Sequence, residues 1–583
     1  MMKVNRNILW SEIFINRLVK MGAAYACISP GSRNTSLAFA IANNQNLKSY
    51  INIDERSSAF FALGLAKASG KPVILASTSG TAVVELYPAI IEAYQQHIPL
   101  IVCTADRSVE LLDNGSNQTI NQNNIFGNHI VWHFDAGLPE VITARLKHIN
   151  TIARRAFYES INHGPVHINF PFRKPFEPEA FTDEADEKLV DSLLIDEFVQ
   201  MSLSESASSI DLSHIAEKIS GSKGLIIASP GNYSNEFYIN CISAAEKLNF
   251  PILADASSGF RTCGTSSKNI LSNYDAFLRS AEFVKKHQPD IILQFGRNVT
   301  SKGLGDFLET ALSPRLLINE WGKWTDSTNN DSYIIKMPPA QLCSELVKLD
   351  IPSAGKEWLD SFLKAEETAD NLRASFLAQA QFPFEGKVVS EILDMMPDNS
   401  ALMISNSMPI RDLDFFASVL NKNIIIYNNR GASGIDGVIS TALGIAAASG
   451  KRTTLITGDM AFYYDLNGLL ASMKYNIPLF VVLINNNGGG IFEMLPVAKS
   501  GKHFKEFFIA PHNLDFSHFV KGYNGTYSLA DSWSGLKEQY KQTFERSDLA
   551  VIEIKTDSHN STQTRRDFWK KTTQTIDNAY KNK

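Results

Sequence analysis

The sequence predicts an α/β protein of three domains, each built on a parallel sheet flanked by helices. Three observations favour this class. The chain has 583 residues, which is too long for one hydrophobic core. Short apolar runs rich in β-branched residues alternate with longer segments of helical periodicity. Many of these runs end in glycine or in polar residues, as strands of open parallel sheets do where they meet a ligand.

The first domain is predicted to span residues 1–182. A helical pattern at 57–70 lies among its predicted strands, which are 25–30, 73–79, 100–105 and 165–172. Residues 177–213 are acidic and rich in serine, and they interrupt the alternation of strands and helices. This stretch therefore predicts a linker.

The second domain is predicted over residues 205–350 and the third over residues 370–583. Strands of the second domain are predicted at 223–231, 250–259, 290–296 and 315–322. A helical segment at 355–381 follows them. Strands of the third domain are predicted at 401–405, 423–429, 453–458, 479–486 and 550–555.

Composition excludes several classes of protein. Charged residues make up 20% of the chain and the net charge is -6, so a nucleic-acid partner is not expected. The five cysteines are odd in number and far apart, which indicates neither a disulfide framework nor a zinc site and favours a reducing cytoplasm. The chain start lacks a long apolar segment and the later apolar runs are short, so we expect no membrane insertion.

Two neighbouring strand ends in the third domain carry oxygen ligands. Asp459 directly follows the strand 453–458, and Asn486 ends the strand 479–486. Divalent cations such as Mg²⁺ take oxygen ligands and often join protein carboxylates to phosphates. We therefore predict a site for Mg²⁺ or Mn²⁺ formed by the side chains of Asp459 and Asn486 and the carbonyl of Gly488, which has no Cβ to obstruct it. Taken alone, Asp459 is also typical of an ordinary turn or helix cap.

The arrangement of these residues resembles the cofactor motif of thiamine-diphosphate (ThDP) enzymes. Met460 stands where that motif usually has glycine. A ThDP enzyme also needs a carboxylate against the aminopyrimidine ring of the cofactor, to move a proton. Glu55, between a strand at 49–53 and a helical pattern, is predicted as this catalytic and cofactor-binding residue. In isolation it is equally typical of an acid in the first turn of a helix.

Seven segments together resemble one family of ThDP enzymes, the 2-succinyl-5-enolpyruvyl-6-hydroxy-3-cyclohexene-1-carboxylate synthases (MenD). The likeness lies in the first and third domains and is weak in the second. The segments are CISPGSRNTSL (27–37), IDERSSAFFALG (53–64), STSGTAVVELYPAIIEA (77–93), ADRSVELLDNGSNQTINQ (105–122), NSMPIRDLD (406–414), NNRGASGIDGVISTALG (428–444) and NNNGGGIFEMLP (485–496).

The resemblance implies an activity in menaquinone biosynthesis. The family decarboxylates 2-oxoglutarate on ThDP and adds the resulting succinic-semialdehyde carbanion to isochorismate. Both substrates are dianions, so cationic groups and helix N-termini are expected near the cofactor. The turn at 29–36 fits this expectation, because it joins a strand to a helix and carries Ser32 and Arg33 as further donors.

The resemblance also assigns substrate-binding residues. Arg107 and Gln118 match positions that line the isochorismate pocket, and Lys302 is the expected lysine of the second domain. Gly303 stands where some relatives have a second basic residue, and whether Arg297 replaces it is left open by the sequence. The distal carboxylate of the oxoglutarate-derived adduct is assigned to Ser407, Arg411 and Arg430; Ser407 and Arg411 would share a face if their segment is helical.

Three apolar residues complete the predicted site. Ile435 matches the bulky residue over which the family bends ThDP. Ile491 and Phe492, next to the glycine run at 488–490, are expected to pack on the cofactor and the substrate. Ordinary core packing is the alternative for each of the three.

Glu55 and the metal-binding residues lie in different domains and must meet across an interface. The resemblance implies that this interface joins two subunits, so we expect a homodimer, which could pair further into a tetramer. A rival interpretation is an acetolactate-synthase-like carboligase or decarboxylase, which would share Glu55, Asp459 and Asn486 but lack the other anion-binding set. A second rival is a catalytically silent protein on the same scaffold, which the retained glutamate and metal-binding pair disfavour.

Overall fold

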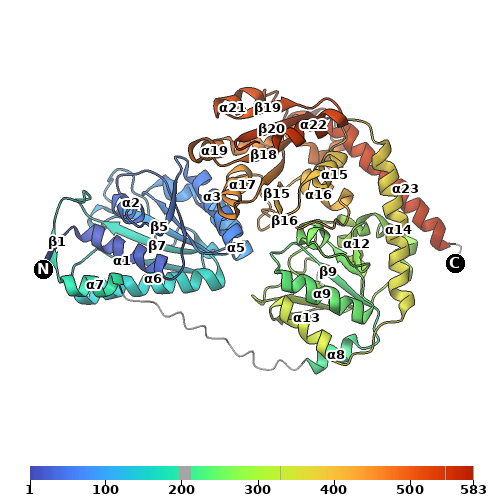
Figure 1. Cartoon of the computed structure of the whole chain (residues 1–583), viewed down its shortest axis with the longest axis horizontal. Coiled ribbons are helices and arrows are strands. Elements are labelled where there is room, and N and C mark those ends of the chain that lie inside the picture. Colours follow the sequence, from blue (N-terminus) through green and yellow to red (C-terminus); the bar gives the residue numbers. More distant parts are fainter. Residues whose placement is uncertain (196–211, 329, 545, 582–583) are drawn as a thin grey trace.

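Three parallel sheets organise the chain (Figure 1). A computed structural model describes residues 1–195, 212–328, 330–544 and 546–581. Within these residues, each of the three large sheets has six strands, and every neighbouring pair in them is parallel. Helices follow most strands, as right-handed crossovers between parallel strands require. The prediction of an α/β fold with three parallel sheets is confirmed.

The amino-terminal sheet has the strand order β3-β2-β4-β5-β7-β6. Its strands are β2 (Tyr25–Ile28), β3 (Lys48–Ile51), β4 (Val73–Ser77), β5 (Leu100–Arg107), β6 (Trp132–Asp135) and β7 (Val166–Phe172). Its helices are α1 (Arg6–Lys20), α2 (Thr35–Ala42), α3 (Glu55–Ser69), α4 (Thr81–Glu85), α5 (Tyr87–Gln96) and α6 (Thr143–His163). Every residue of β4 and β7 is buried, which explains their almost continuous apolar sequences.

Part of the predicted linker is ordered structure. The strand β8 (Asp183–Ala185) pairs antiparallel with β1 (Met2–Val4), and the helix α7 (Glu187–Ile195) packs on α1 and α6. The linker prediction is therefore wrong for 183–195. The acidic residues of this segment dominate its composition and obscure a narrow apolar face. Val190 and Leu193 lie on that face and are buried. Residues 196–211, including the predicted start of the second domain at 205, lie outside the described residues.

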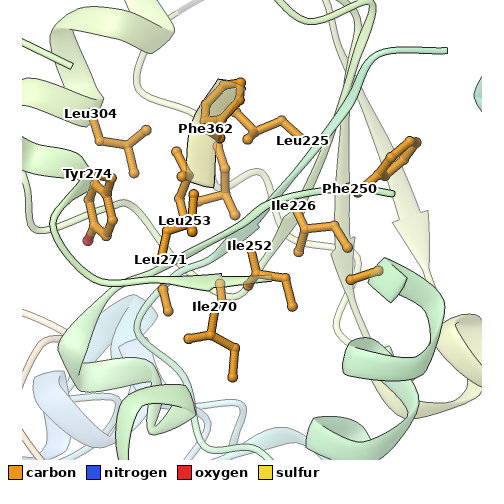
Figure 2. Packing of buried hydrophobic residues seen from close by; sticks show 14 of the residues in the cluster. Leu225, Ile226, Phe250, Ile252, Leu253, Ile270, Leu271, Tyr274, Leu304 and Phe362 are labelled. Carbon is orange, nitrogen blue, oxygen red and sulfur yellow. The ribbon is translucent and has the colours of Figure 1, made fainter. Parts of the chain in front are cut away.

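The central sheet has the strand order β11-β10-β9-β12-β13-β14. Its strands are β9 (Gly224–Ala228), β10 (Ile252–Ala254), β11 (Ile270–Leu271), β12 (Ile291–Phe295), β13 (Arg315–Asn319) and β14 (Ser332–Lys336). Its helices are α8 (Ser213–Ile219), α9 (Asn235–Leu248), α10 (Tyr274–Phe277), α11 (Ala281–Lys286), α12 (Lys302–Thr310) and α13 (Pro339–Lys348). Figure 2 shows Leu253 of β10 and Tyr274 of α10 in the core with Phe362 of the long helix α14 (Lys356–Gln379).

The carboxy-terminal sheet has the strand order β16-β15-β17-β18-β20-β19. Its strands are β15 (Ser400–Ile404), β16 (Ile424–Tyr427), β17 (Thr453–Gly458), β18 (Leu479–Asn485), β19 (Thr526–Leu529) and β20 (Leu549–Lys555). Its helices are α15 (Glu385–Met395), α16 (Met408–Phe416), α17 (Val438–Ser449), α18 (Asp459–Tyr464), α19 (Leu469–Tyr475), α20 (Lys502–Phe504), α21 (Phe516–Gly522), α22 (Trp533–Thr543) and α23 (Ser558–Lys581). The last helix, α23, packs against α11 and α14 of the central domain.

The first and third domains meet where α3 lies against α17 (Figure 1). A Cβ at Gly64 would lie 2.1 Å from the carbonyl oxygen of Thr441, and a Cβ at Gly444 would lie 2.2 Å from that of Phe61. The two backbones are therefore in direct contact, which only glycine at both positions allows. Buried residues from both sheets form one continuous cluster around this crossing.

None of the helices in the described part of the chain is both long enough and apolar enough to cross a membrane.

We expect Gly64→Ala to destabilise the protein, because its methyl group would collide with the backbone of α17. Overpacking of this kind costs about 1–3 kcal/mol. Thermal unfolding measured by calorimetry should show a lower Tm. Gly305→Ala is the matched control, since Gly305 lies in α12 and no atom would lie within 4 Å of the added methyl group. The control should keep or slightly raise the Tm, and an unchanged Tm in Gly64→Ala would contradict the close contact of α3 and α17.

Candidate functional site

The carboxyl edge of the third sheet collects most of the predicted cofactor residues. The strands β16, β15, β17 and β18 are neighbours and parallel, so they end at the same edge. Ser407 follows β15, Arg430 follows β16, Asp459 follows β17 and Asn486 follows β18. Ligands of open parallel sheets bind at this edge.

Asp459 is the first residue of α18 and is buried. Its Oδ1 accepts a hydrogen bond from the backbone N–H of Met460 (2.8 Å), and its Oδ2 accepts one from the N–H of Gly488 (2.9 Å). The Nε2 of His512 lies 3.1 Å from Oδ2. Because Nδ1 of His512 accepts the N–H of Leu514, Nε2 carries the proton and donates to Asp459. Burial raises the pKa of Asp459, and these hydrogen bonds oppose the rise.

The glycine run at 488–490 is required by close contacts. A Cβ at Gly488 would lie 2.0 Å from the carbonyl oxygen of Ile509, and Gly488 has φ +141°, which favours glycine. A Cβ at Gly490 would lie 2.6 Å from Nδ2 of Asn486. The run therefore lets the backbone segment at 508–509 approach and leaves room for the Asn486 amide.

Among the three consecutive asparagines, Asn486 alone keeps a side-chain oxygen without a partner in the described residues. Its Nδ2 donates to Oε1 of Glu385 (3.0 Å), while its Oδ1 is buried and accepts no hydrogen bond. The side-chain oxygens of Asn485 and Asn487 instead accept backbone N–H groups at 2.9 and 3.1 Å. A buried, unpaired oxygen is costly unless a ligand completes it.

This donor set fits a hard divalent cation. The Asp459 carboxylate, the Oδ1 of Asn486 and the Gly488 carbonyl are all oxygen ligands, as Mg²⁺ or Mn²⁺ requires. In the described ranges, no group of three or more His, Cys, Asp or Glu side chains could hold a metal by itself. A set with one carboxylate needs further oxygens, and a diphosphate would supply them.

Glu55 is the first residue of α3 and is half-buried. The helix is capped by Asp54, whose Oδ1 accepts the N–H of Ser57 at 3.1 Å. Burial raises the pKa of Glu55, and the nearby charges of Asp54 and Glu85 raise it further. No other residue that the structure describes pairs with the Glu55 carboxylate.

The start of α3 is docked against the end of α18 in the same chain. Nδ2 of Asn467 donates to Oδ2 of Asp54 (2.8 Å), and a terminal nitrogen of Arg56 donates to the carbonyl of Tyr464 (2.8 Å). Within the described part of the chain, however, no hydrogen bond or ion pair joins Glu55 to Asp459, the residue at which α18 begins.

Arg33 and Arg107 come together at the carboxyl edge of the first sheet. Arg33 is buried and donates to the carbonyl of Phe172 (2.8 Å), while its Nε has no hydrogen-bond partner in the described residues. Burial, followed by the charge of Arg107, lowers the pKa of Arg33 to about 10, and Asp106 opposes this. Arg107 ends β5, and its side chain donates twice to the carbonyl of Asn117, at 2.6 and 3.2 Å. Two adjacent guanidinium groups that form no ion pair within the described residues are suited to bind an anion.

Gln118 and Ser32 flank this arginine pair. Gln118 has φ +56°, and its Nε2 donates to the carbonyl of Ser79 (2.9 Å). Ser32 precedes Arg33 and is exposed, and its carbonyl accepts the hydroxyl of Thr35 at 2.7 Å. Both residues lie on loops at the carboxyl edge of the first sheet.

A second cationic pair, Arg411 and Arg430, lies at the edge of the third sheet. Burial and then the charge of Arg430 lower the pKa of Arg411. Arg411 donates to the backbone carbonyl of Ser407 (2.5 Å), and Ser407 caps α16 with φ +70° rather than lying inside the helix. The segment is helical from Met408 onward, so Arg411 lies in the helix while Ser407 is its N-cap, and the two residues meet. The Nε of Arg430 is buried without a hydrogen-bond partner in the described residues, and its guanidinium contacts Oδ1 of Asn406 at 3.5 Å.

Arg430 also borders a large cavity. The cavity has a volume of about 690 Å³ and lies between the three domains. Arg297 of the central domain and His97 of the first domain line it as well. Arg297 and Arg430 thus share one cavity, whereas Glu55, Asp459 and Asn486 lie outside its lining.

The central domain contributes less than the sequence predicted. Lys302 is exposed, and its ammonium group pairs with Asp306 one turn along α12 (2.8 Å). No described contact joins Lys302 to another predicted site residue. The absence of a basic side chain at Gly303 has a steric reason, because a Cβ there would lie 2.7 Å from the carbonyl oxygen of Asp275.

The three predicted apolar residues lie in the segments before α17 and after β18. Ile435 is half-buried against the core shared by α3 and α17. Ile491 and Phe492 belong to a short helical turn at Gly490–Met494, directly after the glycine run. The Phe492 ring lies edge-on to Phe508, with centroids 5.6 Å apart.

Several residues of this site were missed by the sequence analysis. Asn406 lies inside one of the resembling segments, and its Nδ2 donates to the carbonyls of Asn429 and Gly434, which shapes the loop before α17. His512 and Glu385 contact Asp459 and Asn486 but lie outside every motif. A histidine in a loop and a glutamate in the first turn of a helix carry no signal of such a role.

Comparison with protein families gives three matches along the chain. The model described as "Thiamine pyrophosphate enzyme, N-terminal TPP binding domain" matches residues 10–125. "Middle domain of thiamine pyrophosphate" matches residues 197–404, and "Thiamine pyrophosphate enzyme, C-terminal TPP binding domain" matches residues 417–554. Thiamine pyrophosphate is ThDP. The chain is therefore a ThDP-dependent enzyme.

Curated relatives match almost the whole chain. A protein of Bacillus velezensis is 38% identical, over 95% of this chain and 96% of its own length. Proteins of Geobacillus kaustophilus and Haloquadratum walsbyi are 37% and 34% identical, each over 96% of this chain and 97% of their own length. All three relatives are named 2-succinyl-5-enolpyruvyl-6-hydroxy-3-cyclohexene-1-carboxylate synthase.

We expect Gly488→Ala to disturb the glycine run, because the added methyl group would meet the carbonyl of Ile509. The variant should lose about 1–3 kcal/mol of stability and bind ThDP with Mg²⁺ more weakly. Thermal unfolding and a fluorescence titration with ThDP measure the two effects. Gly522→Ala, at the end of α21 with no atom near the added methyl, is the control. Wild-type ThDP binding by Gly488→Ala would refute the tight packing at this turn.

Proposed function

This chain belongs to the 2-succinyl-5-enolpyruvyl-6-hydroxy-3-cyclohexene-1-carboxylate synthase family, and from that premise we propose the reaction it performs and the residues involved. The enzyme decarboxylates 2-oxoglutarate and transfers the remaining four-carbon unit to isochorismate in menaquinone biosynthesis. The observation that carries this proposal is the full-length similarity to synthases of this name. The acetolactate-synthase-like alternative is not favoured, because the relatives with this name match 95–96% of the chain.

The carboxyl edge of the third sheet holds the cofactor in this proposal. Asp459, Oδ1 of Asn486 and the carbonyl of Gly488 would hold Mg²⁺ or Mn²⁺, and the ion would supply positive charge for the diphosphate. When bound, ThDP supplies the nucleophilic carbon and the electron sink that decarboxylation of a 2-oxo acid needs. Ile435 would support the cofactor, and Ile491 and Phe492 would pack on it and exclude water.

Glu55 moves a proton at the pyrimidine ring. A carboxylic acid works best in this role when its pKa approaches the working pH. Burial raises the pKa of Glu55 in that direction, and no partner side chain in the described residues competes for the carboxylate.

The two cationic pairs divide the substrates between them. Arg411 and Arg430, with Ser407, bind the distal carboxylate of the 2-oxoglutarate-derived unit. Ser32, Arg33, Arg107 and Gln118 bind isochorismate. Because no ion pair with a carboxylate is formed by either pair in the described residues, an anionic substrate would supply a closer negative charge. Lys302 would reach the isochorismate site only if its ion pair with Asp306 broke.

The site forms between two subunits of a homodimer, which could pair further into a tetramer. Apolar side chains beside Glu55 support an interface there. Ile53 is 69% exposed, and Tyr463 and Tyr464 at the end of α18 are 54% and 49% exposed. Large apolar side chains gathered around one helix start are typical of an interaction surface.

The enzyme works in the cytoplasm according to this proposal. All five cysteines are free thiols, which suits a reducing compartment.

The reaction can be tested with purified protein, ThDP, Mg²⁺, 2-oxoglutarate and isochorismate. We expect the absorbance of isochorismate to fall while carbon dioxide is released, and both to require all components. The proposal fails if pyruvate serves as the donor and 2-oxoglutarate does not.

We expect Arg411→Met to weaken use of 2-oxoglutarate, because a charged hydrogen bond to its distal carboxylate is lost. Such a bond contributes about 1.5–3 kcal/mol, so kcat/KM for 2-oxoglutarate should fall about 10- to 100-fold. Arg546→Met is the control, since Arg546 is exposed and pairs with Asp548. Equal kcat/KM values in the two variants would remove Arg411 from the substrate site.

Mixed dimers test whether the site joins two subunits. We expect Glu55→Gln and Asp459→Ala each to be nearly inactive when purified alone. Co-expressed, the two chains should recover about a quarter of wild-type activity, because half of randomly paired dimers are mixed and each mixed dimer has one intact site. If both residues acted within one chain, every site would contain one substitution and no activity would return.

A further inference from the structure

We propose that Glu385 is a positioning residue for the metal ion: it fixes the side-chain amide of Asn486 so that Oδ1, and not Nδ2, faces the ion. This inference rests on the metal site of the proposed function. Glu385 itself is not a metal ligand in this proposal, since its carboxylate accepts a hydrogen bond from Nδ2 of Asn486, on the side of the amide opposite to Oδ1.

The hydrogen bonds around Asn486 define one orientation of its amide. Nδ2 donates to Oε1 of Glu385 at 3.0 Å, and the hydroxyl of Thr556 donates to the same oxygen at 2.9 Å. Oδ1 on the other side is buried and has no partner in the described part of the chain. The amide therefore has a satisfied donor side and an unpaired acceptor side.

An asparagine amide presents its oxygen to a metal ion consistently only if a hydrogen-bond partner fixes its orientation. Rotation about its last side-chain bond exchanges oxygen and nitrogen, and that torsion has two broad minima. In the wrong orientation the amide would point N–H groups at a cation. A carboxylate behind the amide resolves this choice, because an ionised carboxylate has acceptor atoms only.

A buried charge network holds Glu385 in place. Arg565 of α23 donates to Oε2 of Glu385 at 2.6 Å and binds Asp412 of α16 through two bonds of 2.7 and 2.5 Å. All three side chains are at most 2% exposed. Burial alone would lower the pKa of Arg565, but Asp412 and Glu385 together raise it. The guanidinium thus ties the first residue of α15 to α16 and α23.

The network leaves one carboxylate oxygen of Glu385 to accept hydrogen bonds from the residues around Asn486. Its Oε2 is engaged by Arg565, so Oε1 is the atom that faces Asn486 and Thr556. Gly490 completes the geometry, because a Cβ there would lie 2.6 Å from Nδ2 of Asn486 and would displace the amide. Groups that orient a metal ligand from behind contribute about 10- to 100-fold to metal affinity.

Glu385→Gln tests the proposal with a readout that does not depend on turnover. The new amide would give its oxygen to Arg565 and turn its NH₂ group toward Asn486, which would then rotate Oδ1 away from the ion. We expect the dissociation constant for Mn²⁺, measured in the presence of ThDP by the electron paramagnetic resonance of free Mn²⁺, to rise about 10- to 100-fold.

Asp412→Asn is the matched control. Asp412 pairs with the same buried Arg565 but does not touch Asn486. The control should lower the Tm as Glu385→Gln does and leave the Mn²⁺ dissociation constant within about threefold of wild type. Equal weakening of Mn²⁺ binding in both variants would overturn the proposal, because the network would then act through stability alone.

A second substitution provides a rescue. In Glu385→Gln with Asn486→Asp, the carboxylate of residue 486 presents an oxygen on both sides, so it can accept from the glutamine and still bind the ion. We expect Mn²⁺ affinity to return at least partly in this double variant. A purely structural defect would not be repaired, and failure of the rescue would count against the proposal.

Glu385→Asp covers the case in which Glu385→Gln does not fold. It keeps the negative charge beside Arg565 but withdraws the carboxylate from Asn486 by one methylene, so Mn²⁺ binding should weaken at least about threefold. Unchanged Mn²⁺ affinity in whichever variant folds would refute the positioning role. If wild-type protein with ThDP fails to bind Mn²⁺, the metal site itself is wrong, which is a different outcome from an unaffected variant.

Discussion

The parallel direction of four neighbouring strands is the constraint on which the site depends. Because β16, β15, β17 and β18 all run the same way, the residues that follow them emerge at one edge of the sheet. Asp459 and Asn486 thereby lie at the same edge of the sheet as Ser407 and Arg430, although helices separate them in the sequence. The glycine contact between α3 and α17 then fixes this edge relative to the domain that carries Glu55.

Polar groups at this edge are held by a second layer of buried charge. Asp459 is fastened by two backbone N–H groups and by His512, and Asn486 is fastened by Glu385. The cationic pairs differ from Asp459, because Arg33 and Arg430 each keep a buried Nε without a partner in the described residues. A buried guanidinium nitrogen without a partner is costly unless a ligand completes it, and an anion is suited to do so.

The sequence predicted the buried strands and the residues that follow them, because strands covered on both faces are continuously apolar and end in recognisable turns. It missed β6, β11, β14 and β19, which are all edge strands and are short or partly exposed. It also missed Glu385 and His512. Their role depends on a partner far away in the chain, Asn486 or Asp459, and no local pattern reports such a contact. The sequence also did not predict that Lys302 is exposed. Its side chain lies on the solvent-facing side of α12, where it pairs with Asp306.

We propose that one ion joins the diphosphate of ThDP to the third domain while an acid from the first domain meets the pyrimidine ring. A crystal structure of the assembled protein with ThDP and Mg²⁺ tests it most directly. We expect a single ion bound by Asp459, Oδ1 of Asn486 and the carbonyl of Gly488, with a Glu55 carboxylate within hydrogen-bond distance of the pyrimidine. An ion bound elsewhere, or a Glu55 that faces a separate cavity, would contradict it.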